Sequence, residues 1–306
     1  MNQTLRRFRR SYFLYSFQRD WVAMTSFTVL LVFLLAGLAA PLIAPYHPWD
    51  PDSIDIMNSE IPPRWMEAGE SSFLLGTDVQ GRDMLSTMLF GLRLSIVIGL
   101  GAVLLQGFLG IVVGLVAGYI GGRADSILMR IADIQLSFPY LMVAIFISAI
   151  FQVAFGIGRY EELAVPLLVV IIGLAEWPVY ARTVRAAVMG EKNKEYVEAA
   201  RVIGLSRGKI MFRHVLPNTL TSVLVISTIQ VANAVMSEAA LSFLGLGMPV
   251  TKPSLGSLIR SGFEYIFSGS WWITFFPGIL LVVFVLVINL LGDWLRDVLN
   301  PKLYKG

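Results

Sequence analysis

The stretch at residues 195–217, EYVEAARVIGLSRGKIMFRHVLP, is polar and basic and stands between long apolar runs. Its spacing predicts two short helices joined at a glycine, because glycine can adopt the left-handed conformation that ends a helix. Proline suits the first turn of the helix that follows, where its missing N–H costs nothing. Such a pair of helices, exposed between apolar segments, indicates a docking surface for another protein. The residues that define the spacing are Glu198, Ala199, Ala200, Gly204, Leu216 and Pro217.

The first of these short helices has two faces with different chemistry. One face is charged, and its side chains are spaced so that they can form ion pairs with one another. The other is small and smooth, which suits a groove on a partner protein. The alternative is a surface helix whose charges are simply solvated. The faces consist of Lys194, Glu198 and Arg201, and of Val197, Ala200 and Gly204.

The remaining residues offer little for catalysis. The chain has no cysteine, which excludes thiol catalysis and iron–sulfur ligation, and His47 and His214 are far apart, which disfavours a histidine-rich metal site. An enzyme site needs a nucleophile, a base and an orienting group together, and no such cluster is evident. There is also no Gly-x-x-x-x-Gly-Lys-Ser/Thr phosphate loop, so we expect no ATPase site of its own.

The composition indicates that these residues are positioned by membrane helices. The 306 residues are 56% hydrophobic and only 15% charged, whereas soluble domains carry about 25% charged residues. Six runs reach or approach the roughly 20 apolar residues that cross a bilayer as a helix. We therefore expect an all-α transmembrane six-helix bundle. The runs are Trp21–Ala44, Leu94–Ile120, Ile134–Gly158, Leu163–Ala181, Val215–Ser237 and Tyr265–Gly292.

The basic residues indicate the orientation of this bundle. Of the 24 basic residues, 18 lie in the N-terminal leader, two alternate connections and the C-terminus, whereas the 45–92 connection has eight acidic residues and two basic ones. The positive-inside rule then places both termini in the cytoplasm. Arg9 and Arg10 faintly resemble a twin-arginine signal, but the apolar run after them is longer than a cleaved signal needs, so we expect it to be retained.

The chain is expected to divide into a leader with its first helix at 1–44, an external polar segment at 45–92, and a five-helix core at 93–306 that contains the loop 182–217. The external segment is long for a connection. It is either a solvated spacer, or a lid or contact for an external partner. Within the core, glycines recur on one face of the second run, which predicts close helix packing, with a flexible gate helix as the alternative. These glycines are Gly107, Gly110, Gly114 and Gly118.

Two acidic residues fall within or at the end of apolar runs, where a charge is costly. For Glu176 the simplest interpretation is that its carboxylate reaches toward the interface. For Glu238 it is a pair with Arg260 or Arg93, or a cap on the following turn. A gate or a substrate contact remains open for both. We expect no proton relay, because no chain of partner acids follows.

The Glu-Ala-Ala, Gly and Leu-Pro spacing resembles the cytoplasmic signature of ABC importer membrane subunits. In that family the loop docks into a cleft on the ATPase and passes its closure to the membrane helices. The position two before Leu216, commonly isoleucine in the broad family, is His214 here. Residues 213–218, RHVLPN, nevertheless resemble one subfamily, the C-type permease of dipeptide, oligopeptide and nickel importers. Residues 75–86, 180–185 and 238–247 resemble further segments of that subfamily, and the resemblance extends over about residues 20–300.

The resemblance implies an N-terminal helix plus the five-helix core of a type I importer permease, in the cytoplasmic (inner) membrane of a bacterium. It implies a B-type permease, one or two ATPase subunits and an extracytoplasmic solute-binding protein as partners, and no nucleic acid. It implies no metal or cofactor in this chain, with ATP and Mg on the ATPase subunits, and alternating access coupled to ATPase closure. Peptides, nickel chelates, glutathione and opines are all compatible solutes.

Two functions from other classes are weaker. A secondary transporter or channel acting alone would favour paired broken helices or intramembrane acids in corresponding halves, and no internal repeat is visible. A membrane enzyme lacks a catalytic cluster.

Overall fold

The computed structural model describes residues 12–50 and 54–299, and its regular elements over these ranges are helices, apart from one isolated bridge between Thr77 and Asp83. The N-terminal part contains α2 (Tyr12–Arg19), α3 (Trp21–Leu38), α4 (Ala40–Ile43) and a short 3-10 turn, η2 (Ile56–Asn58). The central part contains α5 (Met84–Ile120), α6 (Gly122–Leu136), α7 (Tyr140–Phe155), α8 (Ile157–Glu191), α9 (Glu195–Val202) and α10 (Arg207–Ile210). The remainder contains η3 (Met211–Val215), α11 (Leu216–Phe243), α12 (Leu255–Tyr265), η4 (Ile266–Ser268) and α13 (Trp272–Val298).

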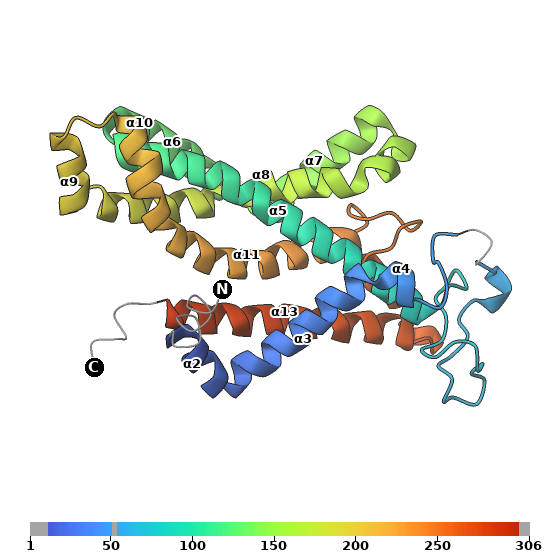
Figure 1. Cartoon of the computed structure of the whole chain (residues 1–306). Coiled ribbons are helices and arrows are strands. Elements are labelled where there is room, and N and C mark those ends of the chain that lie inside the picture. Colours follow the sequence, from blue (N-terminus) through green and yellow to red (C-terminus); the bar gives the residue numbers. More distant parts are fainter. Residues whose placement is uncertain (1–11, 51–53, 300–306) are drawn as a thin grey trace.

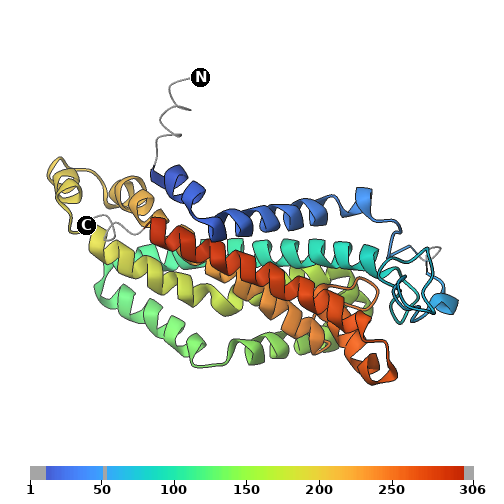
Figure 2. The same cartoon turned by 90° about the horizontal axis from the view of Figure 1, so that it is seen from below.

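Five helices in the described part of the chain are long and apolar enough to cross a membrane, or six if a bent pair counts as one span. The bent pair is α6 and α7, which meet at 82° (Figures 1 and 2). The predicted span Ile134–Gly158 is therefore not one continuous helix. Pro139 lies at the break with an extended backbone, because proline has no N–H to donate and disfavours helix in the residue before it.

The other membrane helices also differ in their ends from the predicted runs: α8, for example, covers Ile157–Glu191 where the predicted run is Leu163–Ala181. α5 begins at Met84, ten residues before the predicted Leu94, because the side chain of Asp83 accepts a hydrogen bond from the backbone N–H of Ser86 and caps it. The last helix begins at Trp272 and not at Tyr265, because Gly269 adopts a left-handed conformation that prevents a continuous helix from Tyr265 onward.

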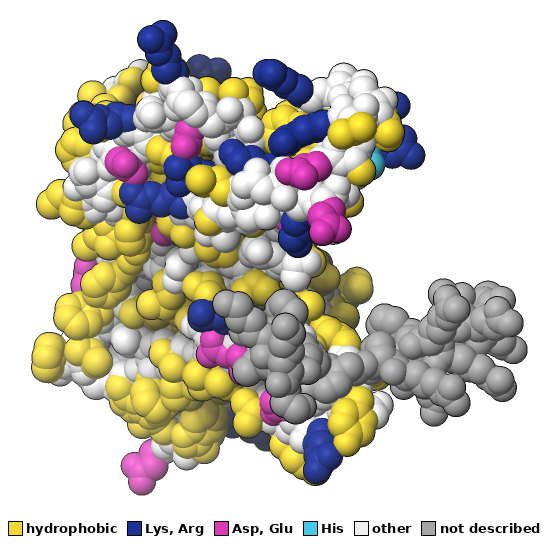
Figure 3. Space-filling model, turned by 90° about the vertical axis from the view of Figure 1, so that its left-hand side faces the viewer, with side chains coloured by type: hydrophobic (Ala, Val, Ile, Leu, Met, Phe, Trp, Pro, Cys, Tyr) yellow, Lys and Arg dark blue, Asp and Glu magenta, His cyan; other side chains and the backbone are white. Residues whose placement is uncertain are grey.

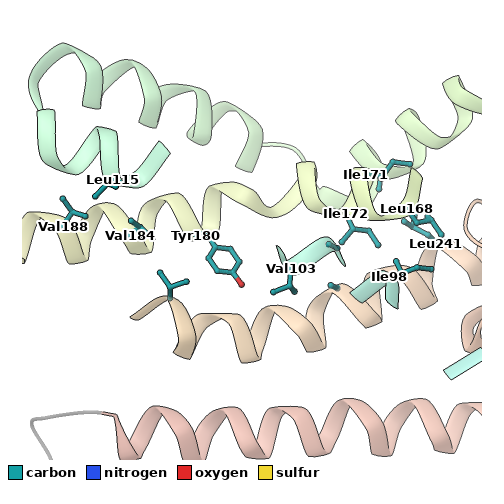
Figure 4. Packing of buried hydrophobic residues seen from close by; sticks show 14 of the residues in the cluster. Ile98, Val103, Leu115, Leu168, Ile171, Ile172, Tyr180, Val184, Val188 and Leu241 are labelled. Atoms are coloured by element: carbon teal, nitrogen blue, oxygen red, sulfur yellow. The ribbon is translucent and has the colours of Figure 1, made fainter. Parts of the chain in front are cut away.

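The most extensive contact between two helices of the described chain is that of α5 with α8, at the glycine face of α5. A Cβ atom added at Gly110 would lie 2.2 Å from the Cβ of Tyr180, and one at Gly114 would lie 2.5 Å from the carbonyl oxygen of Ala181. The prediction of close packing is therefore confirmed at this face, because only glycine lets the two backbones approach so closely. Figure 4 shows Tyr180, Val184 and Val188 of α8 within this core.

The other helices are arranged around this pair. α3 and α13 lie together and pack on α5 and α11 through a second apolar cluster that includes Leu92, Phe284 and Ile288. The short helices α9 and α10 lie at one end of the bundle, and the segment 45–83 lies at the other (Figure 1). Both α8, which leads into α9, and α11, which follows α10, run between the two ends.

Replacing Gly110 by alanine is expected to destabilise the bundle, because the new methyl group would clash with Tyr180 and with the backbone of Trp177. Overpacking of this kind costs about 1–3 kcal/mol, so the thermal unfolding temperature of the purified chain should fall. Gly278→Ala in α13 is the matched control, because a Cβ there meets nothing within 4 Å. Equal shifts for the two variants would contradict the packing argument.

Candidate functional site

The end of α9 has the geometry that the glycine spacing predicts. The backbone N–H of Leu205 donates to the carbonyl of Ala200 at 3.1 Å, and that of Gly204 donates to the carbonyl of Arg201 at 3.0 Å. This is a Schellman pair of hydrogen bonds, and it requires the left-handed backbone that Gly204 adopts with φ of 81°. The predicted break between two short helices at Gly204 is confirmed.

The small face of α9 is turned toward the chain itself. Val197 and Ala200 are 0% and 3% exposed and belong to the same core as Ile210 and Val215. The expectation that this face meets a partner is therefore wrong for these two residues, since helical spacing defines a shared face and not the neighbour that covers it. The surface left outside contains Glu198 and Ala199, together with Arg201, Val202 and Ile203.

The charged face of α9 also has partners that differ from those expected. Lys194 pairs with Glu191 at the end of α8 at 2.6 Å, and Arg201 donates to the backbone carbonyl of Lys192 at 3.1 Å. In the described ranges Glu198 makes no ion pair within 4.0 Å, so the predicted pairing across this face is wrong. The end of α8 lies closer to these cations than the next turn of α9 does. The carboxylate of Glu198 is left exposed at this end of the molecule.

Tyr196, which the sequence did not predict as a functional residue, joins α9 to both neighbouring membrane helices. The hydroxyl of Tyr196 donates to the carboxylate of Glu191 at 2.6 Å and accepts from the amide of Asn218 at 3.1 Å. Partial desolvation of its hydroxyl and the bond to Glu191 raise the pKa of Tyr196 to about 12. Asn218 directly follows the Leu-Pro pair, which was the available sequence signal for this contact.

The Leu-Pro pair lies at the start of α11, as predicted, but no loop separates it from α10. The π-helical turn η3 joins α10 to α11, so the helix continues from Arg207 to Phe243. A π turn changes the hydrogen-bond register, which accommodates a proline that cannot donate to the preceding turn. Leu216 is half-buried and Pro217 is exposed.

The helix that leads into the loop is held by basic side chains. Arg185 of α8 makes two bonds to the carboxylate of Asp125 in α6, at 2.5 Å and 2.7 Å. Arg182 forms an ion pair with Asp133 in α6, and Lys192 donates to the carbonyl of Gly118 at the end of α5 at 2.7 Å. Figure 3 shows Lys and Arg side chains gathered at this end of the molecule. α5, α6 and α8 are thereby fastened together where the loop begins.

A buried polar layer connects the same helices in the middle of the bundle. The side-chain amide of Gln230 in α11 donates to Glu176 of α8 at 2.8 Å and to Gln106 of α5 at 2.9 Å. Glu176 is only 8% exposed, so the expectation that it reaches toward the interface is wrong. The amide of Gln230 supplies the hydrogen bond that a buried carboxyl group needs, so Glu176 need not extend to the membrane surface. Asn233 extends the layer by donating to Gln230 at 2.9 Å.

Glu238 is fully buried near the other end of α11. Ser95 of α5 donates to it at 2.8 Å and Ser242 at 2.7 Å. The expected pairing with Arg260 or Arg93 is wrong, because the carboxyl group of Glu238 accepts hydrogen bonds from these two serine hydroxyls and forms no ion pair with a described residue. Glu238 thus links α11 to α5.

The far end of the bundle is closed by residues 45–50 and 54–83. Asp78 and Arg82 form an ion pair at 2.6 Å with side chains 1% and 2% exposed, and Arg82 also donates to the carbonyl of Val250 at 2.9 Å. The indole of Trp272 donates to the carbonyl of Thr77 at 3.0 Å. Burial raises the pKa of Asp83, although hydrogen bonds from Ser86 oppose this shift. The segment is therefore tied to α13 and to the loop after α11, which excludes a simple solvated spacer.

Comparison with known proteins identifies the class to which this arrangement belongs. A family described as "binding-protein-dependent transport system inner membrane component" matches residues 110–305. The chain belongs to this family of multi-pass membrane proteins. The N-terminal transmembrane domain of oligopeptide transport permease C matches residues 1–63, which makes the chain a C-type permease.

Individual relatives cover nearly the whole chain. The di/tripeptide transport system permease protein DppC of Pseudomonas aeruginosa is 39% identical over 94% of this chain and 90% of that protein. The dipeptide transport system permease protein DppC of Haemophilus influenzae is 36% identical over 95% of this chain and 94% of that protein. A solved inward-facing conformation of the MetNI methionine ABC transporter superimposes with a TM-score of 0.49 and 23% identity over 66% of this chain and 93% of that chain.

The buried Asp78–Arg82 pair yields a stability prediction. Replacing Arg82 by methionine leaves an uncompensated buried carboxylate, so we expect a loss of about 3–5 kcal/mol in unfolding free energy, measured by denaturation of the purified chain. The double variant Arg82→Met with Asp78→Leu should recover much of this loss. Arg182→Met is the control, because its ion pair with Asp133 is 53% exposed on each side and worth about 0–1 kcal/mol. Equal losses for Arg82→Met and Arg182→Met would refute the role of burial.

Proposed function

We propose that this chain is the membrane-spanning permease subunit of an ATP-driven importer for short peptides or similar small solutes. The observation that carries the proposal is the identity of 39% over 94% of the chain with a di/tripeptide permease. The family assignment and the membrane helices are consistent with it.

The proposal includes partners that supply what this chain lacks. ATP and Mg bind to one or two separate ATPase subunits, a B-type permease completes the pathway, and an extracytoplasmic solute-binding protein delivers the solute. This chain itself takes no cofactor. It lies in the cytoplasmic (inner) membrane with both termini and α9 on the cytoplasmic side, which agrees with the basic side chains near α9 (Figure 3).

In this proposal the exposed surface of α9 is the contact with the ATPase. Glu198 and Ala199 offer a free carboxylate beside a small side chain, and Val202 and Ile203 are 87% and 73% exposed at the helix end. Apolar side chains this exposed next to a charge are typical of a docking surface. Ala200 faces inward and anchors α9 to the core.

The other residues of the loop transmit the movement of α9. Gly204 ends the helix and fixes the direction of the chain toward α10, while Leu216 and Pro217 start α11. Tyr196 bonds to Glu191 of α8 and to Asn218 of α11, so a displacement of α9 moves both helices together. These helices meet again in the polar layer at Glu176 and Gln230. ATPase closure thus changes the access of the pathway to the two sides of the membrane.

The test is reconstitution of the chain with its partner subunits in proteoliposomes. Glu198→Ala removes the exposed carboxylate, and Gly204→Val forces a β-branched residue into a left-handed backbone, which costs at least about 1–2 kcal/mol. We expect both variants to assemble and to lose most of the solute-stimulated ATPase activity and uptake.

Glu162→Ala is the matched control, because Glu162 is an exposed carboxylate at the opposite end of α8. Undiminished stimulated ATPase activity in both loop variants would refute the coupling role of α9. Uptake by the purified chain alone, driven by an ion gradient, would favour a secondary transporter instead.

A further inference from the structure

A cavity of about 460 Å³ lies at the end of the bundle opposite α9. Its walls come from α7, the first turn of α8, the segment that follows α11, and α12, with Val79 of the segment 45–83 at one side. The volume falls in the range of about 300–1,000 Å³ that is typical of small-ligand sites. The side chains that matter for its chemistry are Glu161, Ser242, Arg260, Ser261 and Glu264.

The only cation among the lining residues is Arg260, and the backbone around it is shaped to admit its side chain. A Cβ atom added at Gly245 would lie 1.4 Å from a guanidinium nitrogen of Arg260, so the guanidinium lies directly against this glycine. Gly245 has φ of 82°, a conformation that disfavours any other residue. No carboxylate of the described chain lies within 4.0 Å of this guanidinium.

Two carboxylates line the same cavity. Glu264 follows Arg260 by one turn of α12, and Glu161 comes from the start of α8. Over residues 12–50 and 54–299 neither of them forms an ion pair within 4.0 Å. The cavity therefore presents one cation and two anions whose charges are not used inside the chain.

The wall that carries Gly245 is held in place by buried hydrogen bonds. The hydroxyl of Tyr160 lies 2.6 Å and 2.7 Å from the carbonyl oxygens of Leu246 and Gly247. The hydroxyl of Ser242 accepts from the backbone N–H of Met248 at 2.9 Å. Because these bonds are internal to the chain, a ligand that meets Arg260 need not order this segment on binding.

We propose that this cavity binds the free termini of a short zwitterionic peptide, with the peptide carboxylate at Arg260 and its ammonium group at Glu161 and Glu264. A guanidinium is suited to a carboxylate because it donates two parallel hydrogen bonds. The two carboxylates exceed the single cation by one charge, which favours an ammonium group over a second anion. The identification of the zwitterion as a transported peptide rests on the proposed function; the binding site does not.

The experiment measures binding of L-alanyl-L-alanine to the full chain in lipid nanodiscs, without a solute-binding protein, by equilibrium dialysis. The same measurement is made with the C-terminal amide and with the N-acetyl derivative of the dipeptide. We expect the wild type to bind the free dipeptide about tenfold more tightly than either derivative, since each lacks one charge-assisted contact.

The variants assign each terminus to its side chain. Arg260→Gln should weaken binding of the free dipeptide about tenfold and remove the preference for the free carboxylate over the amide. The double variant Glu161→Gln with Glu264→Gln should remove the preference for the free amine over the acetyl form. Arg159→Gln and Glu162→Gln make the same charge changes beside the cavity but outside its lining, and should change nothing.

The proposal is overturned if the wild type shows no saturable binding of the dipeptide, or if Arg260→Gln unfolds at the wild-type temperature and still prefers the free carboxylate. It is also overturned if Arg260→Gln weakens only the docking of the solute-binding protein. Failure of the proposed function is separate: reconstituted wild type that binds the dipeptide but shows no ATP-driven uptake refutes the transport function and leaves the site intact. Conversely, if the reconstituted wild type shows ATP-driven uptake but no cavity variant changes binding of the dipeptide, the site is refuted and the transport function stands.

Discussion

The close approach of α5 and α8 is the constraint on which the rest of the structure depends. Lipid is as apolar as the helix surfaces, so helix association in a membrane depends on packing and on hydrogen bonds more than on burial from water. At Gly110 and Gly114 the backbones of the two helices come close enough that a methyl group would clash. This fixes α8 along its length, and α8 carries Glu176 in the polar layer and leads directly into α9.

Hydrogen bonds between polar side chains then set how α11 joins this pair. The carboxyl groups of Glu176 and Glu238 are both buried, and each is satisfied by neutral donors from a neighbouring helix. A buried polar group without a partner is costly, so each such bond restricts the helices to the arrangement in which the donor is present. The polar layer around Gln230 thus connects α5, α8 and α11 at a depth where apolar packing alone would allow them to slide.

The two ends of the bundle differ in how firmly they are built. The far end is closed by a buried ion pair at Asp78 and Arg82 and by the bond from Trp272 to the segment 45–83. At the α9 end the inner face is packed through Val197 and Ala200, while the outer face leaves charged and apolar side chains exposed. An exposed but anchored helix can receive a force from a partner and pass it on, which a freely mobile loop cannot do.

The sequence by itself determined the helical membrane class, the break at Gly204, the start of α11 at the Leu-Pro pair and the glycine packing face. Each of these follows from a local rule: the length of an apolar run, the left-handed conformation that glycine permits, the missing N–H of proline, or the absence of a side chain. A family resemblance followed from the same local motifs, and the comparisons confirm it.

Only the tertiary structure decided which neighbour each side chain meets. The inward turn of Val197, the amide at Glu176 and the Ser95 hydroxyl at Glu238 all depend on residues distant in the sequence. Helical spacing states which residues share a face, but the packing of the other helices decides whether that face is covered, and by what. For this reason the break after α9 at Gly204 was predictable from the sequence, whereas the burial of Val197 and Ala200 was not.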